Sequence, residues 1–560
     1  MSKAKLLLQK IHLIKEDRPP FQQRMIIFMV ALGGILIIAF VIYLGFFTYF
    51  QKSIAHYLPA DKTVAFAEVE NMYLPLKLES KNEFSTANIE NGIKDLFNID
   101  LKSVVKDWTA GRVGIALIEN KGEANTPVFF LHTNNRRKTA KYFESLLMPG
   151  EELVKNGTLT LPIYSYPQGQ TFSFGFVGPY LIVSNSLPAL TAVQESFAKP
   201  ELTLAENKNY LKSIGNLPRT SWLRGYIDYQ ALDFKNNLAV NSVIQPLKNV
   251  INHFAFTVKQ NPNGFHFNTF VNLKPELLSL RQENRDKTRF AYQLTDYISS
   301  KDLTLYIGGA NLSNEWENTL ETISNLNPAY GIILESVVRA QVNKVFGSEV
   351  DLRNDFYPLF EGEYAFSMAV GDDGNTNLSL LLSHDDREFV ETKLKKMMNG
   401  FKYLAAQFAP KLRVVTLPDG TESRELVADV TSLEETSEKY EGYSVHCLEV
   451  KGTSYGFCYT VTDNLMAMAN NLDTVKTTVD LSLSPKNALS QYQPFRQAIG
   501  NLSKVSDEIT FIDIQKLSKL ISGQLIGQIS EPYLNAFDAT AWVKHYFDDG
   551  ASTEGYILIK

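Results

Sequence analysis

Two short motifs in the first half of this 560-residue chain, IGNL at 214–217 and YIDYQAL at 226–232, recur in the second half. They return there as IGNL at 499–502 and FIDIQKL at 511–517, displaced by the same number of positions. Matches that share one frame indicate an internal duplication. Because the repeating unit is far longer than a solenoid repeat, the pattern predicts two tandem domains.

The duplication extends on both sides of these motifs. Segment 57–71 parallels 297–311, segment 100–117 parallels 351–368, and segment 254–274 parallels the C-terminal 540–560. These correspondences predict that residues 57–274 and 299–560 form two repeat lobes. A helical connector at 275–298 would join them.

Each lobe contains short segments in which apolar and polar residues alternate, as in half-buried strands. They include VAFAEV (64–69), VGIALIE (113–119), VFFLHT (128–133), TFSFGFV (171–177), LIVSN (181–185), WLRGYIDY (222–229) and FHFNTFVNL (265–273). The predicted helical segments are 136–148, 186–198, 276–298, 316–346 and 385–408. Helices that fall irregularly among hairpins favour an α+β fold, with a mainly antiparallel sheet per lobe and helices packed on one face.

Ahead of the lobes, residues 25–50 (MIIFMVALGGILIIAFVIYLGFFTYF) carry no charge. The run exceeds the roughly 20 residues that cross a bilayer as a helix, and its aromatic end suits the headgroup layer. The preceding residues 1–24 are mainly basic, so the positive-inside rule keeps this tail cytoplasmic. A cleaved signal peptide would have a shorter apolar region ending in small residues. The sequence therefore predicts a single-pass inner-membrane protein with a periplasmic or extracellular body.

The charge of the chain restricts its partners. Its formal net charge is −6, with 55 basic and 61 acidic residues. Nucleic-acid binding requires clustered Lys and Arg, so a nucleic-acid partner is not expected. Nor is general adhesion to anionic lipid.

The two cysteines, Cys447 and Cys458, flank a predicted two-residue turn at Gly452-Thr453. In a hairpin with that turn they face each other directly, within reach of a disulfide. They would lie on the more polar face, opposite an apolar face that includes Leu448 and Phe457. An oxidising exterior favours a structural disulfide. Two free neighbouring thiols are the alternative.

No catalytic signature is found. Gly452-Thr453-Ser454-Tyr455-Gly456 fits G-x-S-x-G, but a strand follows it where a nucleophile elbow requires a helix. The histidines lack zinc-site spacing, and His384-Asp385-Asp386 is explained by a helix N-terminus. Asp228 and Asp513 recur inside the repeated motif, where a strand-end hydrogen bond is a simpler role than paired catalysis. We expect no catalytic residue, no metal, no cofactor and no enzymatic activity.

The order of motifs resembles the bacterial domain-of-unknown-function family 3352, whose members are largely membrane-anchored envelope proteins. It runs from PADKT (59–63) through the tyrosine-bearing strand pair of 163–185 to LAENKNYLKSIG (204–215) and YIDYQAL, with LFEGEYAFSM (359–368) as the glycine hairpin. The resemblance covers nearly all of 57–560. It implies localisation and architecture, and it implies no activity or functional residue.

Three functions follow as hypotheses. The first is a non-enzymatic interaction or scaffold protein of the envelope, binding other envelope or membrane proteins. The second is a carrier of lipid or another apolar ligand, held in a groove beside the sheet. The third is an enzyme that uses Asp228 and Asp513. The helical segment 316–346 is apolar in character and fits either a contact surface or core packing. Its apolar residues are Ile323, Leu326, Ile332, Ile333, Val337 and Val338.

Overall fold

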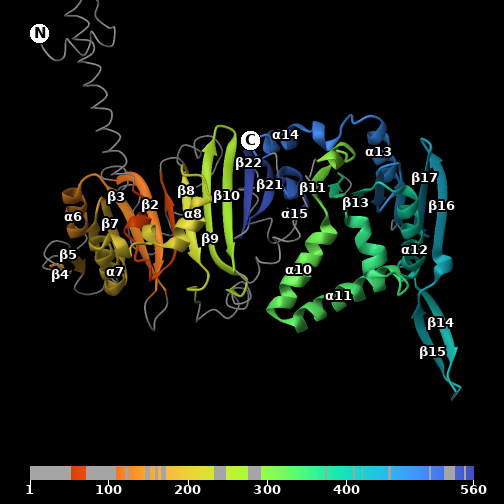
Figure 1. Ribbon diagram of the computed structural model, residues 1–560, viewed down its shortest axis with the longest axis horizontal. Helices are drawn as coiled ribbons and strands as arrows, with labels where there is room; N and C mark the ends of the chain where they lie inside the picture. The colour runs from red at the N-terminus through yellow and green to blue at the C-terminus, as the bar shows by residue number, and fades with distance from the viewer. Residues whose placement is uncertain are drawn as a thin grey trace, which may run out of the picture.

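The structure is a computed structural model, and its central feature is one antiparallel sheet of 20 strands, seen along its length in Figure 1. A separate two-stranded hairpin stands beside it. The residues described are 52–70, 109–119, 125–145, 152–157, 162–165, 172–232, 248–274, 292–371, 375–407, 410–418, 420–451, 456–503, 506–521, 536–547 and 550–560.

The first half of the chain contributes ten strands. Their spatial order is β4–β5–β6–β7–β3–β2–β1–β8–β9–β10. The bounds are β1 Thr63–Val69, β2 Thr109–Ile118, β3 Thr126–Thr133, β4 Val154–Gly157, β5 Pro162–Ser165, β6 Ser173–Val177, β7 Tyr180–Ser184, β8 Leu223–Asp228, β9 Ile251–Asn261 and β10 Gly264–Leu273.

The second half repeats this order from the middle of the sheet outward, as β22–β21–β20–β11–β12–β13–β19–β18–β17–β16. The bounds are β11 Leu303–Ala310, β12 Glu363–Val370, β13 Thr376–Ser383, β16 Leu433–Tyr440, β17 Tyr443–Val450, β18 Gly456–Val461, β19 Leu465–Ala469, β20 Glu508–Asp513, β21 Phe537–Phe547 and β22 Gly550–Ile559. The separate hairpin is β14 Lys411–Thr416 with β15 Glu422–Val427.

The two halves meet where β10 pairs antiparallel with β22. The register places Asn268 opposite Glu554, and these two residues are equivalent in the duplication, so a pseudo-two-fold axis passes between them. Glycines permit the close approach at both ends of the junction. A Cβ on Gly264 would lie 2.0 Å from the Ile557 carbonyl oxygen, and one on Gly550 would lie 2.1 Å from that of Val271.

Each half has its own core, and the same aromatic arrangement recurs in both. Tyr210 packs edge-on against Tyr226, with ring centroids 5.4 Å apart, and it also contacts Phe66. In the second half Phe495 packs edge-on against Phe511 at 5.3 Å and contacts Tyr306. The repeated rings contribute apolar burial at the same point beneath each half of the sheet.

Nine α-helices accompany the sheet in the described residues. They are α6 Arg136–Ser145, α7 Leu187–Ala198, α8 Lys208–Gly215, α10 Leu312–Leu326, α11 Pro328–Phe346, α12 Arg387–Ala406, α13 Leu472–Leu483, α14 Gln493–Ile499 and α15 Ile514–Ile521. Segment 316–346, predicted as one helical stretch, is two helices. Asn327 caps α11 and Pro328 opens it, so α10 ends before them.

The predicted fold class is wrong in its arrangement, although the α+β content is consistent with the structure. The halves do not have separate sheets, because β10 and β22 make the sheet continuous. Helices also cover both faces. Phe143 of α6 packs with Leu131, whereas Val193 of α7 packs with the neighbouring Phe130, which points to the other face.

The predicted transmembrane helix does not appear in the described structure. Within the ranges given above, no helix is both long and apolar enough to cross a bilayer. Residues 25–50, on which that prediction falls, lie outside the described residues, as do residues 1–24. Of the predicted connector 275–298, only residues 292–298 are described, and they contain a short 3-10 helix at Gln293–Asp296.

Candidate functional site

Asp228 and Asp513, the aspartates preserved by the duplication, each end a strand and bond to the following turn. Asp228 accepts hydrogen bonds from the backbone of Gln230 and Ala231. Asp513 accepts one from the backbone N–H of Lys516, in the first turn of α15. These are local capping roles, of the kind that aspartate commonly fills.

The two aspartates cannot act as a pair. Asp228 lies opposite His253 near the start of β9, and Asp513 lies opposite Ala539 near the start of β21. Those strands run in opposite directions, so the aspartates lie at opposite ends of the sheet's strands. Four strands also separate β8 from β20, which amounts to more than about 20 Å at the usual spacing. A shared active site built on both carboxylates is therefore excluded.

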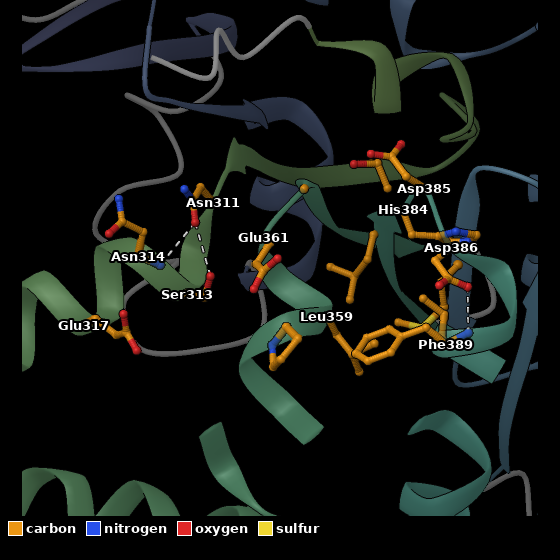
Figure 2. Close-up of a pocket in the computed structure, with 16 residues that line it drawn as sticks. Asn311, Ser313, Asn314, Glu317, Leu359, Glu361, His384, Asp385, Asp386 and Phe389 are labelled. Carbon is orange, nitrogen blue, oxygen red and sulfur yellow. Dashed lines mark hydrogen bonds between the residues drawn. The ribbon is translucent and has the colours of Figure 1, made fainter. Parts of the chain in front are cut away.

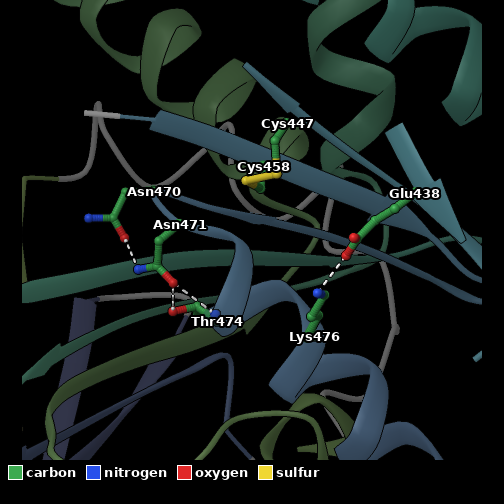
Figure 3. The surroundings of a disulfide bond; sticks show 7 residues. All are labelled: Glu438, Cys447, Cys458, Asn470, Asn471, Thr474 and Lys476. Atoms are coloured by element: carbon green, nitrogen blue, oxygen red, sulfur yellow. Dashed lines mark hydrogen bonds and ion pairs between the residues drawn. A yellow bond between two sulfur atoms is a disulfide. The ribbon is translucent and has the colours of Figure 1, made fainter. Parts of the chain in front are cut away.

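The disulfide between Cys447 and Cys458 is formed, in the predicted register, with the two Cα atoms 4.1 Å apart (Figure 3). The prediction that it lies on a polar face is wrong. Both cysteines are buried with Val475 of α13, which covers this face. A partly exposed salt bridge of 2.6 Å also joins Lys476 of α13 to Glu438 of β16.

The disulfide has no free ligand atom for a metal. In the part of the chain that the structure describes, the one cluster with metal-ligand spacing is Cys447, Glu449 and Cys458. Both sulfurs are bonded to each other there, so neither is available as a thiolate. Ser454, the serine of the G-x-S-x-G match, lies outside the described residues.

A cavity of about 950 Å³ opens at one end of strands β11, β12 and β13 (Figure 2). Two helices begin at its wall. Asn311 caps α10 by accepting from the Asn314 N–H at 3.3 Å, and Asp386 caps α12 by accepting from the Phe389 N–H at 2.9 Å. Between them Glu361 projects from the turn that precedes β12.

The charge of this cavity is negative. Its lining carries four carboxylates and neither lysine nor arginine: Glu317, Glu361, Asp385 and Asp386 are the acidic members. His384 also lines it, and burial lowers the pKa of that imidazole, so it is mainly neutral at pH 7. His384, Asp385 and Asp386, noted in the sequence as a helix start, are brought together with Glu361, which sequence reasoning did not select. The carboxylate oxygens of this lining would suit a ligand group that is cationic or that donates hydrogen bonds.

An apolar stripe on α11 is the second notable feature. Tyr330, Ile332, Ile333 and Val337 are 50–67% exposed, although each is large and apolar. Tyr330, Ile333 and Val337 follow the i, i+3, i+7 spacing of one helix face. Val338 and Phe346, on the other face of α11, pack into the cluster beneath. The structure thus separates the exposed residues of α11 from its core residues, which the sequence left undivided.

The α10–α11 pair projects away from the sheet, as Figure 1 shows. The β14–β15 hairpin also projects beyond the sheet in Figure 1, and it exposes apolar residues, among them Leu412, Val414 and Leu426. Leu412 and Leu426 are cross-strand partners on one face of this hairpin. A two-stranded hairpin gains little stability alone, so an apolar face left in water at this position is a candidate contact surface.

Together these features define a class: a duplicated, single-sheet α+β protein with projecting apolar elements and an acidic cavity. The chain belongs to the family described as "Protein of unknown function (DUF3352)", whose profile matches residues 154–532. This confirms the family resemblance predicted from the sequence. Comparison with curated proteins gives no match.

Among solved structures, crystal form I of TP0453 is similar with a TM-score of 0.24 and 12% identity, over 40% of this chain and 79% of that one. Crystal form III of TP0453 is similar with a TM-score of 0.23 and 11% identity, over 42% and 86%. A likeness this distant defines neither the architecture nor the role of this chain.

Proposed function

We propose that this chain is a non-enzymatic envelope protein that binds a partner protein through the apolar stripe of α11. The observation that carries the proposal is the exposure of Tyr330, Ile332, Ile333 and Val337 on a projecting helix pair. Three of these residues, Tyr330, Ile333 and Val337, share one helix face, and large apolar residues gathered in this way mark contact sites more often than scattered ones do. The i, i+3, i+7 spacing suits a partner helix laid along it.

The proposed location is the outer side of a membrane, with residues 25–50 in the lipid. Support comes from the uncharged apolar run and the basic residues ahead of it. The α10–α11 pair follows Ala310, the last residue of β11. Leu303, the first residue of β11, lies at the other end of the sheet's strands, and this is also the end where Lys52, the first described residue, lies. This placement points the stripe away from the lipid.

Two cavities in the described part of the chain bear on the lipid-carrier alternative, and neither supports it. The larger one is lined by four carboxylates. A smaller one of about 530 Å³, between α12 and β16–β18, is lined by Arg387, Lys395 and Lys402 together with Glu391 and Glu435. An acyl chain requires a mainly apolar lining, so neither cavity favours this function.

The proposal is tested by photo-crosslinking in the native host. A photoreactive residue at Ile333 of the full chain should give a discrete protein adduct. The same residue at Leu211, an exposed apolar position on α8, is the matched control and should give none. Adding Val337→Asp should abolish the Ile333 adduct without changing the amount of folded protein, because exposed substitutions rarely cost more than about 0.5 kcal/mol. Equal adducts at both positions, or an adduct indifferent to Val337→Asp, would contradict the proposal.

A further inference from the structure

The first described residues are built into the core of the first half. Ile54, Ala55 and Leu58 are fully buried. The carbonyl oxygen of Lys52 accepts hydrogen bonds from the Arg112 guanidinium at 3.0 Å and from the Tyr180 hydroxyl at 3.1 Å. Residues 52–58, which follow the predicted membrane segment 25–50 closely in the chain, are therefore fixed to the sheet. If residues 25–50 are held in a membrane, this attachment limits how far the sheet can move from that membrane.

The buried contacts around Lys52 are ionic as well as polar. The Ile54 N–H donates to the Glu68 carboxylate at 2.8 Å, and Arg112 forms a salt bridge of 3.3 Å with Glu70. Glu68 and Arg112 are both almost fully buried. Charges buried at this depth are costly unless they are paired or hydrogen-bonded, and the bond of Glu68 to Ile54 and the pairing of Arg112 with Glu70 supply this. These contacts hold residues 52–58, the entry segment, in one arrangement.

Exposed basic side chains surround this entry segment. Arg136, Arg137 and Lys138 form the first turn of α6, and the Arg136 guanidinium donates to the carbonyl of Gly178. Gly178 in turn lies against the Tyr57 ring. Further exposed basic residues at the same strand ends are Lys52 itself and Arg219.

Three cations in the first turn oppose local helix electrostatics. The N-terminus of a helix carries partial positive charge, which favours acidic residues there. The equivalent helix of the second half follows that rule more closely: Asp386 caps α12, and Glu388 lies in its first turn. A local rule broken in only one of two duplicated copies indicates selection for something other than stability.

We call the exposed basic residues Lys52, Arg136, Arg137, Lys138 and Arg219 the basic edge, and few acidic groups offset its charge. In the ranges that the structure describes, Glu70 is bonded to Arg112, and Glu206 lies near His56. The chain as a whole is acidic, with a formal net charge of −6. The positive charge around the entry segment is therefore a local feature, and the net charge of the whole chain does not show it.

We infer that this basic edge, formed by Lys52, Arg136, Arg137, Lys138 and Arg219, rests on anionic lipid headgroups of the membrane that holds residues 25–50. The inference rests on the proposed membrane location. Arg and Lys side chains near an anionic surface are attracted to it, and the attraction decays over a Debye length of about 10 Å at 0.1 M salt. The entry segment keeps the basic edge within that range because residues 52–58 cannot swing away.

The test uses the full chain reconstituted in lipid nanodiscs that carry nitroxide-labelled headgroups. A fluorophore is attached at Thr220→Cys, next to Arg219 and exposed, and in a second protein at Tyr330→Cys on α11. The native cysteines are bonded to each other and buried, so labelling is selective. In discs with about one-third anionic lipid, we expect the Thr220 label to be quenched several-fold more than the Tyr330 label. The excess should fall in 1 M salt, where the Debye length is about 3 Å.

Charge reversal supplies the decisive comparison. Arg136→Glu, Arg137→Glu and Lys138→Glu together should reduce quenching at Thr220 to its value in purely zwitterionic discs. The matched control reverses three exposed lysines of the second half and should leave quenching unchanged: Lys344→Glu, Lys395→Glu and Lys411→Glu. Thermal midpoints of both variants confirm folding.

The outcomes separate this inference from the proposed function. Quenching that is the same at Thr220 and Tyr330, or indifferent to the α6 reversal, overturns the lipid contact while the crosslink at Ile333 still stands. A chain that does not enter nanodiscs overturns both the membrane location and the lipid contact. Equal quenching in anionic and zwitterionic discs shows proximity without charge recognition and also overturns the inference.

Discussion

Asp355 joins the segment beneath α11 to α12, and replacing it by asparagine should destabilise the second half measurably. The carboxylate is nearly buried, with 5% of its side chain exposed, and it forms salt bridges with Lys393 at 2.8 Å and with Lys396. It also accepts a hydrogen bond of 2.9 Å from the Asp351 N–H. Asparagine keeps the shape and one acceptor but removes the charge that both lysines require.

The magnitude follows from the pKa of Asp355. Burial alone would raise this pKa, but the hydrogen bonds from Lys393 and Lys396 outweigh burial and lower it from 3.8 to about 2. At 1.36 kcal/mol per pKa unit this corresponds to about 2 kcal/mol. Lys396 is 40% exposed, so solvent screens part of the interaction. We therefore expect Asp355→Asn to lower the free energy of unfolding by about 1 to 2 kcal/mol at pH 7.

The same linkage fixes the pH dependence. A carboxyl whose pKa is lowered on folding contributes stability above its unfolded pKa near 4, and that contribution is lost as the pH falls toward 2. The difference between Asp355→Asn and the unmodified chain should therefore be constant from pH 7 to about 5 and should narrow below pH 4.

The assay is urea unfolding in mild detergent, followed by tryptophan fluorescence, because Trp316 packs against the cluster beneath α11. Asp463→Asn is the control: its side chain is 83% exposed and its distance to Arg387 is 3.5 Å, so it should change stability by less than about 0.5 kcal/mol. Equal losses for the two variants, or a difference for Asp355→Asn that stays constant down to pH 2, would refute the reasoning.

Two further predictions concern the disulfide and the glycine at the β10–β22 junction. Replacing Cys447 and Cys458 together by alanine should cost about 2 to 3 kcal/mol, since the disulfide closes a short loop, and a lower thermal midpoint under non-reducing conditions would show it. No change in that midpoint would contradict the prediction. Gly264→Ala should destabilise the β10–β22 junction by more than about 2 kcal/mol, because its Cβ would collide with the Ile557 carbonyl, whereas Gly215→Ala, with open space at its Cβ and a helical position, should be neutral or stabilising. Similar unfolding midpoints for the two glycine variants would show that the close approach at the junction does not matter.

Local structure could be predicted well from this sequence. The alternation in VAFAEV and FHFNTFVNL corresponds to β1 and β10, and Cys447 lies opposite Cys458 in the register predicted for their hairpin. These features depend on residues near one another in the chain. The side-chain period of two and the turn chemistry determine them without reference to the rest of the fold.

What could not be predicted depends on segments far apart in the chain. Nothing in β10 or β22 alone shows that their edges pair, although Gly264 and Gly550 at equivalent positions are a signal of close backbone approach. Similarly, the cysteines look half-polar in their hairpin and are buried because α13 covers them. The acidic cavity was missed because Glu361 and Asp385 come from separate turns that only the sheet brings together.

The β10–β22 junction joins two copies that belong to one chain, so their sequences can change independently, which those of two identical subunits cannot. In a homodimer every substitution appears twice, so both ends must stay alike. Here the copies share one chain, and corresponding positions have diverged in sign: Arg112 of β2 has Glu363 as its counterpart in β12. Covalent linkage of the two copies thus lets equivalent positions carry opposite charges in the two halves.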